Sequence, residues 1–330
     1  MFKYNPHKEY ITFNQKPVKS PWGGGNQWLL GFVQYLKKNG YRVNYKLGRK
    51  SICVFIVNSK GLIDSRWRSR KANHITFGID ELNNFKLKYP GVQCIQRVND
   101  TGIHRGNNTI NDIFQKVNEL CDHTVFISSW VHKYHSKVWW NDNKPYSVIN
   151  NSADSSIFSP VGGSIWDKKE PFKIVTHHWS SNFQKGFETY KRLDDLIDEG
   201  VVKNTELYIV GNYPKEIKWK SAKLVSPLFG IEMANMLRSC HTYITASKHE
   251  ASGMHWIEGV QCGLPLLFSR EGGAVADLGK TYGVSIDNDL PAVIKDIKNN
   301  YDEYRQSVLE NLPDSKIMYS EYLMLMSKMV

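Results

Sequence analysis

Short apolar runs alternate with amphipathic stretches along most of the chain, and polar or glycine-containing loops separate them. Runs such as Ser51–Asn58 and Val92–Val98 have the length and composition of buried strands. In the stretches between such runs, for example Thr109–Cys121, apolar residues recur at the spacing of a helix with one inward face. Buried strands that alternate with such helices predict an α/β fold built on parallel sheets.

The alternation starts afresh after residue 160, which predicts two domains. A chain of 330 residues is long enough for two separate cores. Residues 161–170 contain two glycines and charges of both signs, as expected of a linker. We therefore expect an N-terminal α/β domain over residues 1–160 and a C-terminal one over residues 161–315, followed by an amphipathic helix over 316–330.

The composition is that of a globular protein, with 41% apolar and 23% charged residues. No apolar run approaches the roughly 20 residues needed to span a bilayer, and the first ten residues lack the apolar core of a signal peptide. Five cysteines are scattered without C-x-x-C spacing, which favours reduced thiols over a zinc site. These features predict a cytoplasmic protein.

Positive charge is concentrated in the first half of the chain. Residues 1–150 carry 23 Lys and Arg against 9 Asp and Glu, whereas residues 151–330 carry 20 against 23. The excess indicates an anionic partner for the first half, and its densest part is Arg66–Lys71. That cluster suits anionic lipid head groups at a membrane surface, a phosphorylated acceptor or nucleic acid, of which nucleic acid is the least expected; a solvated loop is the commoner explanation.

The stretch Ile244–Val275 reads as a strand, a polar loop, a helix, a second strand and a glycine turn. Glu250 lies in the loop and Glu258 on the helix, and Gly253 lies where the helix begins. A helix N-terminus offers unpaired N–H groups to an anion such as phosphate, and carboxylates accept hydrogen bonds from sugar hydroxyls. Taken singly, each glutamate is better explained as a solvated surface residue.

The pattern E-x7-E, followed by C-G-L-P and then G-G, resembles the donor-site signature of retaining GT-B glycosyltransferases, in particular glycosyltransferase family 4. The resemblance covers most of the chain and is strongest over 172–190 and 240–285. It implies two Rossmann-like domains with a cleft between them, and a C-terminal helix that crosses back onto the first domain. The implied reaction moves a sugar from a nucleotide diphosphate sugar to a glycan or to an anionic or lipid-linked acceptor, with retained configuration and without a metal or other cofactor.

The resemblance assigns roles to residues of this stretch. Glu250 would hold hydroxyls of the donor sugar near the reacting face, and Glu258 would hold the ribose. Backbone N–H groups around Ser252, Gly253 and Met254 would stabilise the diphosphate.

The loop 177–186 supplies the cation of the implied site. Lys185 and Gly186 match the Lys-Gly of the family, in which the lysine contacts the diphosphate. The arginine that the family carries a few residues earlier is missing, and His178, Arg105 and Lys248 are candidates to replace it. By the same resemblance the nucleobase would pack on the backbone of Pro227–Phe229.

Two loops of the first domain complete the predicted site. A glycine run containing Gly24 and Gly25 precedes a helix, and by the resemblance it lies beside the diphosphate and the acceptor. The segment that begins Arg97-Val98-Asn99 follows a buried strand and looks like a subgroup of these transferases, so Arg97 and Asn99 would meet the donor sugar. Asp100 is the candidate acid or base.

Three other interpretations remain open at this point. Asp287-Asn288-Asp289 has the letters of the metal-binding motif of GT-A transferases, although it lies late in the chain. His177 and His178 could bind a metal, but neighbouring side chains on a strand point apart. A protein that kept the fold but only binds sugar or polyanion would also explain the missing arginine. Nothing in the sequence names the nucleobase, the sugar or the acceptor.

Overall fold

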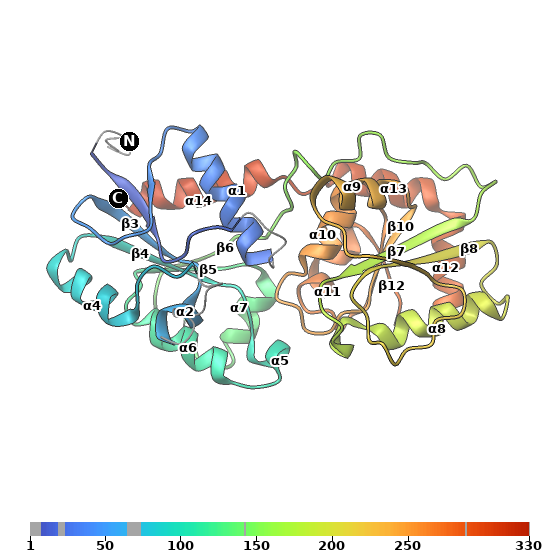
Figure 1. The fold of residues 1–330 in the computed structure, drawn as a ribbon, viewed down its shortest axis with the longest axis horizontal. Helices are drawn as coiled ribbons and strands as arrows, with labels where there is room; N and C mark the ends of the chain where they lie inside the picture. Colours follow the sequence, from blue (N-terminus) through green and yellow to red (C-terminus); the bar gives the residue numbers. More distant parts are fainter. Residues whose placement is uncertain (1–7, 19–23, 65–73, 142, 288, 330) are drawn as a thin grey trace. The chain divides into compact units, whose positions relative to one another are not determined.

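The computed structural model describes residues 8–18, 24–64, 74–141, 143–287 and 289–329 (Figure 1). The basic cluster Arg66–Lys71 and Asn288 therefore lie outside the described residues. The chain forms two compact units. Unit 1 comprises Met1–Asn151 with Lys316–Val330, and unit 2 comprises Ser152–Ser315.

Unit 1 is built on a sheet of six parallel strands in the order β2-β1-β3-β4-β5-β6. The four central strands β1, β3, β4 and β5 are largely buried, as the apolar pattern predicts, whereas the edge strands β2 and β6 are partly exposed. Their bounds are β1 Tyr10–Phe13, β2 Val43–Asn44, β3 Ser51–Ile56, β4 Gln93–Val98, β5 His123–Phe126 and β6 Tyr146–Val148.

Helices cover both faces of this sheet. The apolar sides of α1 and α14 pack on one face, against Phe13 and Phe55, and those of α4 and α6 pack on the other, against Val54 and Ile56. The helices are α1 Gly24–Lys38, α2 Ser59–Ile63, α4 Ile79–Lys88, α5 Gly102–Arg105, α6 Thr109–Asn118, α7 Ser129–His135 and α14 Ser315–Met329.

The C-terminal helix α14 belongs to the core of unit 1. The ring of Tyr322 lies 4.8 Å from that of Trp28, and the ring of Tyr319 stacks on Phe32 at 5.7 Å. Gly31 on α1 leaves no room for a side chain, because a Cβ there would lie 2.0 Å from the Tyr319 hydroxyl. The close approach of the two helices, visible in Figure 1, therefore depends on a glycine at this position.

Unit 2 repeats the design with six parallel strands in the order β12-β11-β10-β7-β8-β9. Strand β7 is longer than expected, because His177 and His178 continue it and pair with Val210 and Gly211 of β8. The strands are β7 Phe172–His178, β8 Thr205–Gly211, β9 Lys223–Val225, β10 Thr242–Thr245, β11 Leu266–Phe268 and β12 Gly283–Ser285.

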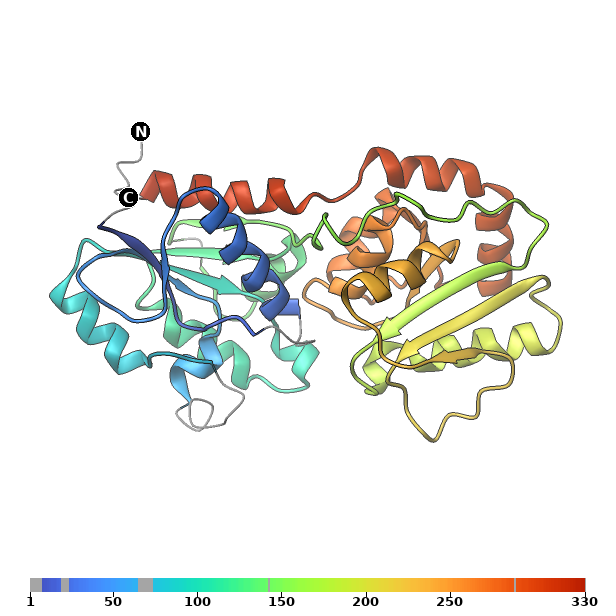
Figure 2. The same ribbon diagram turned by 45° about the horizontal axis from the view of Figure 1, so that its top comes forward.

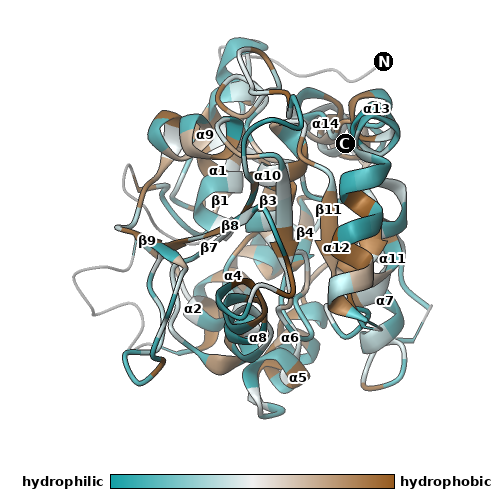
Figure 3. Cartoon of the chain, turned by 90° about the vertical axis from the view of Figure 1, so that its right-hand side faces the viewer, coloured by the Kyte–Doolittle hydropathy of each residue, from teal (hydrophilic) through white to brown (hydrophobic). Residues whose placement is uncertain are grey.

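The helices of unit 2 also divide between the two faces of the sheet. Figure 2 shows α8 along one side of β7 and β8, with α9 and α10, in orange, on the other. In Figure 3 the helices α8 and α12 carry both teal and brown residues, as amphipathic helices do. The elements are α8 Phe187–Asp198, α9 Gly230–Arg238, α10 Met254–Gln261, α11 Ala274–Leu278, α12 Leu290–Asn299, α13 Tyr301–Glu310 and the 3-10 turns η1 Phe183–Lys185 and η2 Gly279–Thr281.

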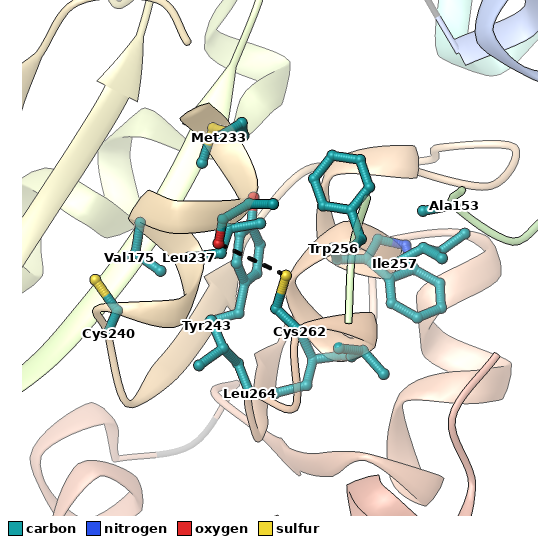
Figure 4. Close-up of a cluster of buried hydrophobic side chains, with 14 of the residues drawn as sticks. Ala153, Val175, Met233, Leu237, Cys240, Tyr243, Trp256, Ile257, Cys262 and Leu264 are labelled. Atoms are coloured by element: carbon teal, nitrogen blue, oxygen red, sulfur yellow. Dashed lines mark hydrogen bonds between the residues drawn. The ribbon is translucent and has the colours of Figure 1, made fainter. Parts of the chain in front are cut away.

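The core between α9, α10 and the sheet is drawn in Figure 4. Tyr243 of β10 and Trp256 of α10 are fully buried there, and Cys262 contacts the carbonyl of Ala234. Burial of each large apolar side chain contributes about 1.5–3 kcal/mol to folding. Phe158 packs in this same core, so residues 152–160, which the sequence assigns to the first domain, fold with unit 2.

Strand order determines where each unit can bind a ligand. In unit 2, β7 and β10 are neighbours at the centre of the sheet, and their connections leave to opposite sides. A crevice forms at the carboxyl ends of two such strands, and this is where open α/β sheets bind ligands. In unit 1 the corresponding position lies between β1 and β3.

Among the described helices, none is long and apolar enough to cross a bilayer.

Candidate functional site

The turn η1 brings Lys185 to the centre of unit 2. Gly186 ends the turn with φ +85°, and a Cβ there would lie 2.4 Å from the backbone of Ala246, so the turn docks closely on the segment after β10. The backbone N–H of Lys248 also donates to the carbonyl of Gln184 at 2.8 Å. In this position the Lys185 ammonium forms an ion pair with Glu250.

The backbone of Glu250 is held by the glycine turn at the end of the signature stretch. Its N–H donates to Gly272 O at 3.2 Å, and its carbonyl accepts from Ala274 N at 2.9 Å. Gly273 has φ +76°, and a Cβ there would lie 2.3 Å from the Glu250 carbonyl oxygen. His249 is held at φ +54°, a strained conformation for a non-glycine residue. Gly272 and Gly273 therefore have a structural role, because they clamp the loop that carries Glu250.

The Glu250 side chain is only 6% exposed, yet its surroundings favour the charged form. Burial raises the pKa of this carboxyl, but His255 and Lys185 outweigh burial and hold its pKa well below the usual range. His255 Nε2 donates to one carboxylate oxygen at 3.0 Å, and Lys185 binds the other. Glu250 is thus an ionised and firmly oriented hydrogen-bond acceptor.

Helix α10 begins beside this carboxylate. Gly253 caps it in the left-handed conformation, and a Cβ there would lie 2.7 Å from Glu250 Oε2. Within the described chain, the N–H groups of Gly253 and Met254 have no hydrogen-bond acceptor. Ser252 is buried, and its carbonyl accepts from Trp256 Nε1 at 2.6 Å. The start of α10 therefore offers N–H groups and the positive end of a helix dipole to an anion.

Glu258 lies one helical turn further along α10. His177 Nε2, at the end of β7, is 2.9 Å from its carboxylate. The backbone N–H of the same histidine donates to the hydroxyl of Tyr243 at 3.0 Å, which ties the end of β7 to β10. Glu258 is therefore oriented by a histidine that the sequence analysis assigned to a loop.

A shallow pocket opens at the carboxyl ends of β7 and β8. It lies next to Trp179, whose side chain is half-exposed, and the segment after β9 closes its other side. The pocket is lined by His177, His178, Trp179, Val210, Gly211, Pro227 and Leu228. This wall is the one that the sequence analysis assigned to the nucleobase.

Three residues, His178, Lys248 and Arg105, were predicted to replace the missing arginine, and the structure shows the surroundings of each. His178 is buried and contacts Tyr190 and Thr176, and burial lowers its pKa well below the usual range, so it is neutral. Lys248 forms an exposed pair with Glu271 at 3.1 Å. Arg105 belongs to unit 1, where it pairs with Asp100 at 2.5 Å. Lys185, by contrast, binds Glu250, whose carboxylate lies beside the start of α10.

In unit 1 the two predicted loops meet. A Cβ on Gly25 would lie 3.3 Å from the side-chain amide of Asn99, so the glycine run approaches the loop after β4. Gly24 and Gly25 form the first residues of α1. Asp100 is largely buried, and besides Arg105 it accepts from the N–H of Thr101 at 2.9 Å.

Arg97 does not occupy the position expected of a donor ligand. It is 1% exposed, and its guanidinium lies 4.2 Å from the ring centre of Trp28. It donates to the hydroxyl of Tyr322 at 3.1 Å and to Asn151 Oδ1 at 2.7 Å. These contacts join the sheet to α1 and α14, and they favour a structural role for Arg97 over the donor contact that the sequence suggested.

Solved structures of glycosyltransferases resemble this architecture over nearly the whole chain. Sucrose-phosphate synthase from Thermosynechococcus elongatus matches with a TM-score of 0.65 at 14% identity, covering 96% of this chain and 98% of that one. A glycosyltransferase from Rickettsia africae matches with a TM-score of 0.62 at 14% identity, covering 97% and 98%. An alpha-glucosyltransferase solved with UDP-glucose and DNA matches with a TM-score of 0.62 at 12% identity, covering 96% and 98%.

The chain has the GT-B fold. The sequence prediction of an α/β protein with two Rossmann-like domains is confirmed by these matches and by the two parallel sheets. No protein-family model matches the sequence, and no curated protein matches it either. At identities of 14% or less, the likeness establishes the GT-B fold and leaves the chemistry to be argued from the site.

Asp287 and Asp289, the two carboxylates of the motif that resembles a GT-A metal site, have structural roles. Asp287 accepts from Ser269, Ser285 and the N–H of Arg270, which closes the turn after β12. Asp289 caps the first turn of α12. In the described part of the chain no three His, Cys, Asp or Glu side chains gather as a metal site would require.

The sequence did not indicate two residues that contact the predicted site residues of unit 2. His255 lies inside the helical stretch of α10, and Tyr243 reads as an ordinary strand residue. Their contacts join segments that lie far apart in sequence, such as 66 residues between Tyr243 and His177. No local pattern could have indicated either contact.

Proposed function

We propose that this protein is a retaining, metal-independent glycosyltransferase that moves a sugar from a nucleotide diphosphate sugar to a glycan or an anionic acceptor. The observation that carries the proposal is the meeting of Lys185, Glu250 and the start of α10 at the centre of a GT-B unit. A cation, two N–H donors and an oriented carboxylate there suit a diphosphate attached to a sugar.

The main electrostatic demand of the reaction is the charge on the departing diphosphate. Lys185 and the N–H groups of Gly253 and Met254 would stabilise this charge. A nucleotide sugar would draw the Lys185 ammonium toward its phosphates and leave Glu250 to the sugar. Glu250 is then the residue that orients the donor sugar through its hydroxyls.

We base the proposed retention of the anomeric configuration on the weak nucleophilicity of Glu250. Its pKa is held low by His255 and Lys185, and a weakly basic carboxylate engaged by two donors is a poor nucleophile. We therefore propose that the acceptor hydroxyl attacks the same face of the sugar that the diphosphate leaves. The proton of that hydroxyl would pass to the departing phosphate oxygen.

We propose the remaining donor contacts from the positions of Glu258 and the pocket in unit 2. Glu258 would accept from the ribose hydroxyls, and the pocket beside Pro227 would take the nucleobase. The glucosyltransferase neighbour was solved with UDP-glucose, which makes UDP sugars the first donors to examine. Gly24, Gly25, Asn99 and Asp100 of unit 1 are proposed to serve the acceptor and the sugar, and the basic surface of unit 1 is proposed to attract an anionic acceptor or membrane.

A thermal-shift screen of nucleotides and nucleotide sugars tests donor binding. A ligand that binds only the folded state raises apparent stability, by about 2.7 kcal/mol at a hundredfold excess over Kd. We expect at least one nucleotide sugar to raise the melting temperature, and Lys185→Gln and Glu258→Gln each to reduce the shift. Lys223→Gln, at a surface pair with Glu206, is the matched control and should keep it. Shifts that are the same in all variants would overturn the site assignment.

A further inference from the structure

A continuous chain of hydrogen-bonding groups joins the two glutamates of unit 2. His255 Nε2 is 3.0 Å from Glu250, and its Nδ1 is 3.1 Å from the hydroxyl of Tyr243. That hydroxyl is 3.2 Å from Nδ1 of His177, whose Nε2 is 2.9 Å from Glu258. The chain thus runs from carboxylate to carboxylate through two imidazoles and one phenol.

The protons in this chain can be counted. Each carboxylate accepts from Nε2 of its imidazole, so in a neutral ring Nδ1 is left as an acceptor. Both Nδ1 atoms, of His255 and of His177, therefore face the hydroxyl of Tyr243. Burial raises the pKa of Tyr243 well above its usual range, so the hydroxyl keeps its one proton. A single proton satisfies only one of the two acceptors, and the other contact lacks a hydrogen bond.

One additional proton satisfies every contact. A protonated His255 donates to Glu250 from Nε2 and to the oxygen of Tyr243 from Nδ1. Tyr243 then donates its own proton to His177, while its oxygen also accepts the backbone N–H of that residue. The geometry therefore has a vacant position for one proton between the two glutamates.

In the free protein, the surroundings of His255 disfavour this additional proton. Burial lowers the pKa of His255, and Glu250 opposes this effect only in part. Among the described residues, the groups that face the ring are Lys185 of η1, Tyr243 of β10, Ser247 and Glu250 of the loop after β10, and His177 and His178 of β7. Lys185 is positively charged and disfavours a second positive charge there.

An anionic donor changes this balance. A diphosphate bound at Lys185 and the start of α10 brings negative charge beside His255, and nearby negative charge favours a protonated imidazole. We propose that His255 and His177 position Glu250 and Glu258 through Tyr243, and that binding of a nucleotide sugar adds one proton to this chain. The imidazolium then supplies the second positive charge that the missing arginine would have provided. This inference rests on the proposed function.

The packing of α10 supports a positioning role for the chain. Gly259 lies over the ring of Tyr243, where a Cβ would come within 2.5 Å of a ring carbon. The helix that carries Glu258 and His255 therefore rests directly on the tyrosine that joins the two histidines. A small shift of Tyr243 would move both glutamates.

Isothermal titration calorimetry of the full chain tests the proposal. UDP-glucose, UDP-N-acetylglucosamine and GDP-mannose are titrated near neutral pH in buffers with different heats of ionisation. Both phosphates of such donors are esterified, so the ligand does not titrate in this range. We expect uptake approaching about one proton per bound donor, and an affinity that rises up to about tenfold for each unit by which the pH falls.

Two variants distinguish proton uptake by the hydrogen-bonded groups from general effects on folding. His255→Gln keeps an N–H for Glu250 but cannot take up a proton, and Tyr243→Phe removes the hydroxyl between the rings. Both should bind the donor more weakly and lose most of the proton uptake. Tyr301→Phe, at another buried tyrosine of unit 2, is the matched control and should keep the uptake.

The outcomes are distinct for the two claims. Donor binding without proton uptake, or uptake that persists in both His255→Gln and Tyr243→Phe, overturns the inference and leaves the proposed function standing. If none of the three donors binds, the proposed function loses its support. In that case 15N NMR of the histidine rings in the free chain decides the positioning claim, because the geometry requires a proton on Nε2 of both rings and a proton on Nδ1 alone would refute it.

Discussion

Lys185 and Glu250 are 65 residues apart in the chain, and their side chains form an ion pair inside unit 2. The Glu250 side chain is buried and the Lys185 side chain is 20% exposed, so a ligand can approach the pair from the lysine side. A buried pair of this kind is costly to separate unless another charge replaces the lost partner. A diphosphate is such a replacement for Lys185, and sugar hydroxyls are acceptable partners for Glu250.

Replacing Lys185 should weaken donor binding directly. Charge-assisted hydrogen bonds contribute about 1.5–3 kcal/mol, so Lys185→Gln should lower the affinity for a nucleotide sugar by roughly tenfold to a hundredfold. Calorimetric titration measures the change. Lys191→Gln, on α8 and paired with Asp195, is the control, and an equal loss there would show that general surface charge is responsible.

The pH dependence of stability should reveal the state of Glu250. Its folded pKa lies below its usual value of 4.5, so the folded state binds the proton less well than the unfolded state. The contribution is therefore present above about pH 5 and is lost as the pH falls through the folded pKa. We expect Glu250→Gln to be about 3 kcal/mol less stable than wild type at neutral pH, with a gap that narrows on acidification.

Denaturant unfolding at a series of pH values measures that gap. Glu206→Gln, at a surface pair with Lys223, should cost at most about 1 kcal/mol over the same range. A constant gap between wild type and Glu250→Gln down to acidic pH would contradict an ionised carboxylate in the folded protein.

Gly273 should be intolerant of a side chain. In Gly273→Ala the Cβ would collide with the Glu250 carbonyl oxygen, and the residue would keep a left-handed φ. We expect a loss of roughly 2–4 kcal/mol and a loss of donor binding, since the loop of Glu250 must move. Gly200→Ala shares the left-handed φ but has open space around it, so it should cost only about 1–2 kcal/mol and leave binding intact. Similar losses in both variants would refute the clamp.

Arg97 should matter for folding more than for the donor. Arg97→Gln removes a buried cation from Trp28, Tyr322 and Asn151, and we expect unit 1 to lose about 2–3 kcal/mol of stability. Donor affinity, measured under conditions where the variant is folded, should change little. Arg49→Gln, at an exposed position, is the control and should be close to neutral. A strong loss of affinity with unchanged stability would restore the donor contact expected from the sequence.

The sequence predicts the elements well where periodicity and breakers agree. The predicted stretches Ser51–Asn58, Val92–Val98 and Thr109–Cys121 form β3, β4 and α6, and their ends agree to within three residues, because the apolar spacing marks each of them. Strand β7 is longer than expected, since His177 and His178 are polar by composition but are buried through pairing with β8. Polarity is a poor guide at the end of a central strand.

The site is predictable only as far as local motifs reach. The motifs around Lys185 and Glu250 predict both residues as part of the site, and in the structure the two side chains form an ion pair. Arg97 follows the same kind of motif, yet its side chain is turned into the core by Trp28 and Tyr322. Whether a polar side chain faces a ligand or a distant helix depends on tertiary packing, which no local pattern contains.

Release of free nucleotide from a nucleotide sugar is the decisive test for glycosyl transfer by this protein. The chain is incubated with the donor that gives the largest thermal shift, a series of acceptor fractions and EDTA, and nucleotide and glycosylated product are measured together. We predict matched release and transfer with retained anomeric configuration, and loss of both in Glu250→Gln at preserved folding. Binding of the donor without release in any acceptor fraction, or turnover that requires a divalent metal ion, would contradict the account.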